Sequence, residues 1–153
     1  MTTVSHLAAL VAILSTGIVY GTDVFCALVQ RAALARVDDA TLTAVMGNVH
    51  RVADRRMRAP GVVGVLAAVV AAVLAGNTVG TVTAGAAFLL LVVWLVLYLR
   101  VSAPINRRLT AAADAGETPA DARVLQRNWD RVIVPRAVLQ GLAVLALGVS
   151  LLG

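Results

Sequence analysis

Long runs of mostly apolar residues limit this chain to folds that suit a membrane. They cover residues 7–29, 81–100 and 132–152, and a shorter run covers residues 60–76. A bilayer core about 30 Å thick is crossed by roughly 20 apolar helical residues. Only 14% of the residues are charged, whereas soluble domains carry about 25%. The sequence therefore predicts an all-α fold, a four-transmembrane-helix bundle that forms one integral membrane domain over residues 1–153.

A break must separate the second span from the third. Joined into one helix, residues 61–99 would extend about 60 Å, twice the thickness of a bilayer core. The segment Gly76-Asn77-Thr78-Val79-Gly80 contains the residue types that end helices. We therefore predict a short turn there, between two helices that cross the membrane in opposite directions.

The distribution of arginine predicts the orientation in the membrane. All 13 basic residues are arginines, and with the abundance of Ala and Val this indicates a GC-rich bacterial genome. One group follows the first span and another follows the third: Arg31, Arg36, Arg51, Arg55, Arg56 and Arg58, then Arg100, Arg107, Arg108, Arg123, Arg127 and Arg131. The positive-inside rule then places both long loops in the cytoplasm and both termini outside the inner or plasma membrane. Arginines that flank apolar spans do not indicate nucleic-acid binding, although the net charge is +5.

Both long loops contain helix signals. The residues Val37-Asp38-Asp39 can cap a helix in the first loop, where apolar residues recur every three or four positions at Leu42, Val45, Met46, Val49 and Val52. This predicts an amphipathic cytoplasmic helix between the first two spans. In the second loop, turn-forming residues at 113–119 precede a predicted lead-in helix to Trp129.

Two ionisable residues, Asp23 and Arg136, lie inside the apolar spans. Each costs roughly 2.5–3.5 kcal/mol at a helix centre on insertion scales, so both should face protein or water. The first and fourth spans run in opposite directions, which allows a direct ion pair. Helical spacing adds Thr16 and Tyr20 to the face of Asp23, and Trp129 and Gln140 to the face of Arg136. The pattern predicts a polar pocket, or alternatively a structural pair that joins two helices.

Histidine and cysteine offer little for a metal site. His50 and Asp54 are four residues apart, and a metal would need a third ligand such as Asp23. One histidine with two carboxylates is not the set usual for non-haem iron. A surface hydrogen bond between His50 and Asp54 is the plainer interpretation, and we expect no cofactor. Cys26 has no partner for a disulfide.

Close helix packing is predicted at Gly17 and Gly21, which form a GxxxG pattern in the first span. Small residues at this spacing allow the backbone of a neighbouring helix to approach. Trp94, Tyr98 and Trp129 lie toward the predicted cytoplasmic boundary, where aromatic side chains commonly anchor a helix. We expect belt or core positions for these aromatic residues.

Three stretches resemble the anthrone oxygenase-like family of small four-helix membrane proteins. They are Gly21-Thr22-Asp23-Val24-Phe25, Pro104-Ile105-Asn106-Arg107-Arg108-Leu109, and Trp129 followed by Arg136. The resemblance implies a membrane-embedded bundle and, for polyketide-pathway members, oxygenation of an anthrone to an anthraquinone without an evident metal or flavin. His50 stands where the family frequently has Asn.

If the chain is such an oxygenase, the chemistry needs a base, and the clustered polar residues lead to a hypothesis about the role of each. Asp23 or His50 would be the base that ionises the substrate, and Arg136, with Asn106 and Trp129, would stabilise and stack the enolate. The predicted catalytic set is therefore Asp23, His50 and Arg136, and the substrate-binding set is Tyr20, Asn106, Trp129 and Gln140.

Another class of function fits the sequence as well. A non-catalytic membrane protein could bind a lipid, another hydrophobic small molecule or a membrane partner, including a second copy in a homo-oligomer. Its many arginines would then lie near acidic lipid headgroups. A small transporter is a weaker alternative, because the two halves of the chain show no inverted repeat.

Overall fold

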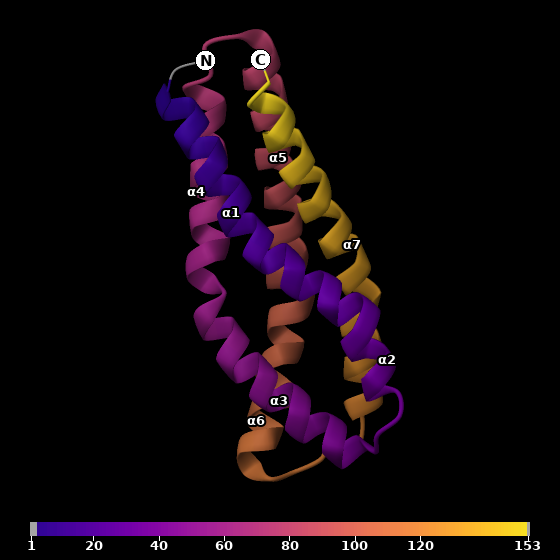
Figure 1. Ribbon diagram of the computed structural model, residues 1–153. Helices are drawn as coiled ribbons and strands as arrows, with labels where there is room; N and C mark the ends of the chain where they lie inside the picture. The colour runs from indigo at the N-terminus through magenta and orange to yellow at the C-terminus, as the bar shows by residue number, and fades with distance from the viewer. Residues whose placement is uncertain (1–2, 153) are drawn as a thin grey trace.

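The computed structural model describes residues 3–152, which form an elongated all-helical molecule without strands (Figure 1). This confirms the predicted all-α class. In chain order the elements are α1 (Thr3–Phe25), a π-helical turn (Cys26–Gln30), α2 (Arg31–Leu34), α3 (Asp39–Arg56), α4 (Arg58–Val73), α5 (Thr78–Leu97), a second π-helical turn (Tyr98–Ser102), α6 (Ala103–Ala115) and α7 (Ala122–Ser150).

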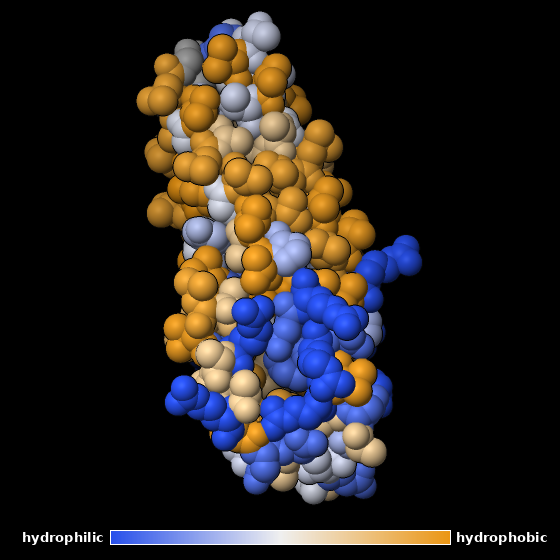
Figure 2. Space-filling model, turned by 90° about the vertical axis from the view of Figure 1, so that its right-hand side faces the viewer, coloured by the Kyte–Doolittle hydropathy of each residue, from blue (hydrophilic) through white to orange (hydrophobic). Residues whose placement is uncertain are grey.

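Three helices are long and apolar enough to cross a membrane, Thr3–Leu34, Thr78–Ala115 and Ala122–Ser150. A fourth span is present if α3 and α4, which meet at a bend of 43°, are counted as one. Large apolar side chains are exposed along these helices, and Figure 2 shows that they cover most of the surface toward one end. The chain is therefore compatible with a multi-pass membrane protein.

The observed helices are longer than the predicted spans. The first begins at Thr3 instead of residue 7, the third continues to Ala115 instead of ending near residue 100, and α7 begins at Ala122 instead of residue 132. Hydropathy identifies only the apolar part of a helix, whereas backbone hydrogen bonding lets the same helix continue into polar residues. The predicted turn at 76–80 begins slightly earlier: α4 ends at Val73 and α5 begins at Thr78.

The end of the molecule where α1 begins and α7 ends (Figure 1) is packed mainly through small side chains. Here α1 packs against α4 and α7, and α5 packs against the same two helices. The fully buried residues of this core are mostly alanines: Ala9, Ala12, Ala68, Ala71, Ala84, Ala87 and Ala143, with Leu147. Alanine lets helix axes approach closely, and the buried Ser5 hydroxyl donates across the α1–α4 contact to the Ala71 carbonyl at 3.0 Å.

At this end of the molecule, the glycine that permits a close contact between helices is not one of those predicted. A Cβ atom on Gly17 or Gly21 would meet nothing within 4 Å, so the prediction of close packing at the GxxxG pattern was wrong for the described residues. A Cβ atom on Gly64 of α4 would lie 2.7 Å from the Thr16 hydroxyl oxygen. Gly64 therefore fixes the approach of α4 to α1.

At the opposite end, α3 packs against α6 and the molecule becomes more polar. Asp38 caps α3 as predicted, since its carboxylate accepts a hydrogen bond from the Thr41 amide at 2.7 Å. The predicted apolar face of α3 is only partly correct. Leu42 and Met46 are buried, whereas Val45, Val49 and Val52 are exposed, because the buried face also includes Thr43, Gly47 and His50.

Two π-helical turns lie where the apolar end meets the polar end. In the first, the Arg31 amide donates to the Cys26 carbonyl, and in the second, the Ala103 amide donates to the Tyr98 carbonyl. Each wide turn adds a residue to the helix without ending it. The second immediately precedes Pro104, which has no amide hydrogen to donate, and the helix continues through this proline into α6.

Candidate functional site

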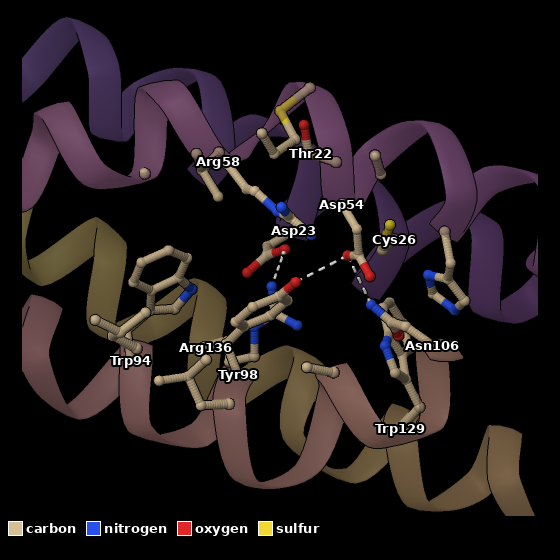
Figure 3. A pocket seen from close by; sticks show the side chains of 18 of the residues that line it. Thr22, Asp23, Cys26, Asp54, Arg58, Trp94, Tyr98, Asn106, Trp129 and Arg136 are labelled. Atoms are coloured by element: carbon tan, nitrogen blue, oxygen red, sulfur yellow. Dashed lines mark hydrogen bonds and ion pairs between the residues drawn. The ribbon is translucent and has the colours of Figure 1, made fainter. Parts of the chain in front are cut away.

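A cavity of about 390 Å³ lies between the alanine-packed end and the polar end (Figure 3). Its walls come from α1, α3, α4, α5, α6, α7 and both π-helical turns. Apolar and aromatic side chains form most of the lining, and several buried or half-buried polar side chains contribute to it. These polar side chains include Asp23, His50, Asp54, Tyr98, Asn106 and Arg136. This volume and lining are typical of a small-molecule site.

The predicted ion pair between Asp23 and Arg136 forms one wall. The Arg136 Nη2 atom donates to Asp23 Oδ1 at 2.9 Å, and both residues are about 5% exposed. Gln140 Nε2 donates to the other carboxylate oxygen at 2.6 Å, so both oxygens of Asp23 accept a hydrogen bond. The Ser102 hydroxyl accepts a hydrogen bond from Arg136 Nη1 at 2.8 Å. A buried ion pair is tolerated only with such additional partners.

The Arg136 guanidinium lies against the Tyr98 ring and has one donor without a partner among the described residues. Its central carbon lies 5.5 Å from the centroid of the Tyr98 ring, which holds the cation in a fixed orientation. The buried Arg136 Nε atom has no hydrogen-bond partner among the described residues. A fixed cation with a free donor beside a cavity can stabilise a negative charge on a bound molecule.

A second polar network lies beside the first (Figure 3). Asp54 Oδ1 accepts two hydrogen bonds, from the Tyr98 hydroxyl at 3.0 Å and from Asn106 Nδ2 at 2.9 Å. The three residues come from α3, the second π-helical turn and α6. The wide turn at Tyr98–Ser102 connects the two networks. Its Tyr98 hydroxyl donates to Asp54, and its Ser102 hydroxyl accepts from Arg136. π-Helical turns are frequent at functional sites.

His50 and Trp129 form the end of the cavity toward α3 and α7. Their ring centroids are 5.5 Å apart with an angle of 51° between the planes. His50 is 3% exposed, and neither its Nε2 atom nor the indole nitrogen of Trp129 has a hydrogen-bond partner in the described part of the chain. Buried polar atoms without partners are rare in folded proteins. Both residues line the cavity.

The structure brings most of the predicted site residues together, but two lie outside the cavity. Asp23, His50, Asn106, Trp129 and Arg136 line it. Gln140 is fully buried behind Asp23 and acts on the cavity only through that carboxylate. Tyr20 was predicted to bind substrate, but its ring packs toward α7, within 3.3 Å of where a Cβ atom on Gly141 would lie.

The weak metal candidate is not assembled. Within residues 3–152, no three or more His, Cys, Asp or Glu side chains are grouped so that they could hold a metal ion. The hydrogen bond expected between His50 and Asp54 is also absent, because Asp54 bonds to Tyr98 and Asn106. His50 is buried at the cavity instead of lying on a hydrated surface.

Sequence reasoning missed several lining residues. Tyr98 and Trp94 were expected to be belt or core residues, yet both line the cavity and stack at 6.4 Å. Trp94, Tyr98 and Ser102 are spaced four residues apart, which indicated that they share one helix face. The π-helical turn at Tyr98–Ser102 changes the helical spacing on that face. Nothing in the sequence indicated that Asp54 would bond to residues 44 and 52 positions away. The exposed Arg58 also lies at the cavity.

No protein-family model, no curated protein and no solved structure matches this chain.

Proposed function

We propose that this chain is a membrane-embedded, cofactor-independent oxygenase of an anthrone-type substrate, a flat and hydrophobic aromatic molecule with an acidic carbon. The observation that carries the proposal is the unpartnered His50 Nε2 atom in an apolar cavity that also holds the fixed Arg136 guanidinium. The residue pattern that resembles the anthrone oxygenase-like family coincides with this cavity at Asp23, Asn106, Trp129 and Arg136.

The proposal includes the membrane topology. The bent pair of α3 and α4 is taken as a cytoplasmic helix followed by a span, which gives four spans with the arginine-rich loops in the cytoplasm and both termini outside. The cavity then lies near the cytoplasmic boundary of the bilayer. A hydrophobic substrate dissolved in the membrane can enter at that depth.

Binding would use the aromatic walls of the cavity. Trp94 and Tyr98 form one stacked pair, and Trp129 lies beside His50 on α7. Flat aromatic molecules pack well against such rings. A substrate seated there would place its carbonyl oxygen near Arg136 and its acidic carbon near His50.

The reaction needs a base more than a redox cofactor. His50 removes a proton from the substrate methylene, and Arg136 stabilises the enolate oxygen that results. The carbanion forms a carbon–oxygen bond with dioxygen, and the peroxide takes up the proton. Loss of the second methylene proton then breaks the oxygen–oxygen bond, so that one oxygen atom becomes the carbonyl and the other leaves as water. Dioxygen is the oxidant.

The geometry favours His50 over Asp23 as that base. Both oxygens of Asp23 already accept hydrogen bonds, from Arg136 and Gln140. The Nε2 atom of His50 has no such competitor among the described residues. Asp23 therefore orients Arg136, and His50 accepts the proton.

Oxygen uptake by the purified chain with an anthrone tests the proposal. We expect the His50→Gln variant to turn over about 100-fold more slowly, as is common when a general base is lost. His6→Gln is the matched control, because His6 lies near the start of α1, at the other end of the molecule. Equal rates for the His50→Gln variant and the wild type would exclude His50 as the base, and no uptake by the wild type would exclude anthrone oxygenation.

A non-catalytic binding protein is the second candidate, and the size and apolar lining of the cavity favour it equally. Native mass spectrometry of the detergent-purified chain separates the two. A retained aromatic or lipid-like molecule in a chain that consumes no oxygen supports binding alone. Its loss in the Trp129→Leu variant would assign the ligand to this cavity.

A further inference from the structure

A second cavity, of about 430 Å³, opens between α2 and α7 on the outside of the molecule. It is separate from the site described above and shares no lining residue with it. Three arginines and one aspartate contribute to its walls. The lining consists of Arg31, Leu34, Ala35, Arg123, Gln126, Arg127 and Asp130. The excess of positive charge favours an anionic ligand.

One of the three arginines has a structural task. Arg123 Nη1 donates to the Leu34 carbonyl at 2.9 Å and its Nε atom donates to Asp39 at 2.6 Å. Another donor of the same guanidinium bonds to the Val37 carbonyl. Arg123 therefore holds the end of α2 and the loop before α3 against α7, and so fixes the shape of the cavity.

The other two arginines form no hydrogen bond or ion pair within the described residues, although the charge of Arg31 lies close enough to Asp130 to act on it. Arg31 on α2 and Arg127 on α7 are exposed, and neither forms a hydrogen bond or an ion pair with another residue of the described range 3–152. They approach the cavity from two different helices. Two guanidinium groups at one opening suit a phosphate group, which can accept hydrogen bonds from both.

The floor of the cavity offers acceptors instead of donors. Gln126 is 5% exposed, and its Oε1 atom has no hydrogen-bond partner among the described residues. Its Nε2 atom donates to Asp130 Oδ1 at 2.9 Å, which fixes the orientation of the amide. A ligand that fills the cavity must therefore carry hydroxyl donors in addition to its phosphate.

The cavity lies where the apolar surface meets the charged end. Figure 2 faces this side of the molecule and shows hydrophilic residues gathered directly below hydrophobic ones. Leu28 and Val29, just before Arg31, are exposed, and so are Val134 and Val138, about two and three turns beyond Arg127 along α7. A ligand held at the cavity would thus have apolar surface beside it for a hydrocarbon chain.

We propose that this cavity binds the headgroup of an anionic phospholipid whose phosphate carries a hydroxylated substituent, as in phosphatidylglycerol. Arg31 and Arg127 bind the phosphate, and Gln126 Oε1 and Asp130 accept hydrogen bonds from the headgroup hydroxyls. The acyl chains lie along Leu28 and Val134. The proposal uses the membrane location of the chain but not the oxygenase reaction.

Native mass spectrometry of the full chain in mixed micelles tests the site. Phosphatidylglycerol is titrated against phosphatidylmethanol, which has the same charge but no headgroup hydroxyls. We expect the wild type to prefer phosphatidylglycerol and the Arg31→Gln/Arg127→Gln variant to bind it about 30-fold more weakly, as for two lost arginine contacts near a bilayer surface. The Gln126→Leu variant should lose the preference while it keeps affinity for both lipids.

The Arg55→Gln/Arg56→Gln variant is the matched control, since it loses the same charge from exposed positions on α3. Equal weakening in both double variants would mean diffuse attraction to anionic lipid and would overturn the site. Glycerol phosphate, added alone, distinguishes a lipid from a soluble phosphate compound. If it binds as tightly as phosphatidylglycerol, the lipid assignment is wrong. Oxygen uptake measured on the same samples reports separately on the proposed reaction.

Discussion

The two ends of this molecule are held together by different kinds of contact. Near the termini, α1, α4, α5 and α7 meet mainly through buried alanines, and Gly64 lets α4 approach α1 closely. Beyond the π-helical turns, larger side chains such as Leu42, Met46, Leu109, Trp129 and Ile133 form the core. The cavity lies at the change from one kind to the other. Small residues bring helices too close for a ligand, whereas wide turns and long polar side chains keep them apart.

Removing the buried charges of Asp23 and Arg136, which lie where the two ends meet, should have the largest effect. Asp23→Leu or Arg136→Leu alone should lower the free energy of unfolding by about 3–5 kcal/mol, because the remaining charge is buried without its partner. The double variant should be more stable than either single variant. Unfolding by detergent titration in mixed micelles measures all three.

Additive losses in that double-mutant cycle would contradict the coupling of Asp23 with Arg136. Ser102→Ala serves as a control, because it removes only the hydrogen bond that Arg136 donates to the Ser102 hydroxyl. It should cost about 1 kcal/mol, the usual value for one such bond.

Overpacking the alanine-rich end should have the next largest effect. Gly64→Val places side-chain atoms where the Thr16 hydroxyl lies and should cost about 1–3 kcal/mol. Gly85→Val is the matched control, because a Cβ atom on Gly85 meets nothing within 4 Å. Thermal stability in detergent compares them. Equal melting temperatures of the two variants would contradict a close contact between α1 and α4 at Gly64.

Loss of a single hydrogen bond in the polar network should have the smallest effect. Tyr98→Phe removes one donor to Asp54, which keeps its bond from Asn106, and should cost about 1 kcal/mol. Tyr20→Phe is the control, since the Tyr20 hydroxyl forms no hydrogen bond with the described residues. The same detergent titration applies. A larger loss for the Tyr20 variant would contradict the assignment of polar stabilisation to the cavity.

The sequence predicted the features that follow from burial of apolar residues and from local residue patterns. Apolar runs indicated the helices that are long and apolar enough to cross a membrane, and Asp38 indicated the start of α3. The cost of a lone charge among apolar residues indicated that Asp23 and Arg136 would meet. Each of these follows from residues close together in the chain or from burial alone.

The rest depended on contacts between distant residues. Asp54 became a partner of Tyr98 and Asn106 only because α3 packs against α6, so the four-residue spacing to His50 was misleading. Tyr20 shares a face with Asp23 on a helical wheel, but it turns toward Gly141 on α7. The long helix through Pro104 was unexpected, because a proline usually marks a boundary unless a wider turn precedes it.

The two π-helical turns also behave as single-residue insertions in otherwise α-helical register. One residue corresponds to about 100° of rotation around a helix axis. Deleting one residue from either turn would leave the apolar half of that helix unchanged and rotate its polar half by this angle. Arg31 would then leave the second cavity, or Asn106 would leave the first. The alignment of both cavities with the apolar end of the molecule is thus set by one extra residue in each of two helices.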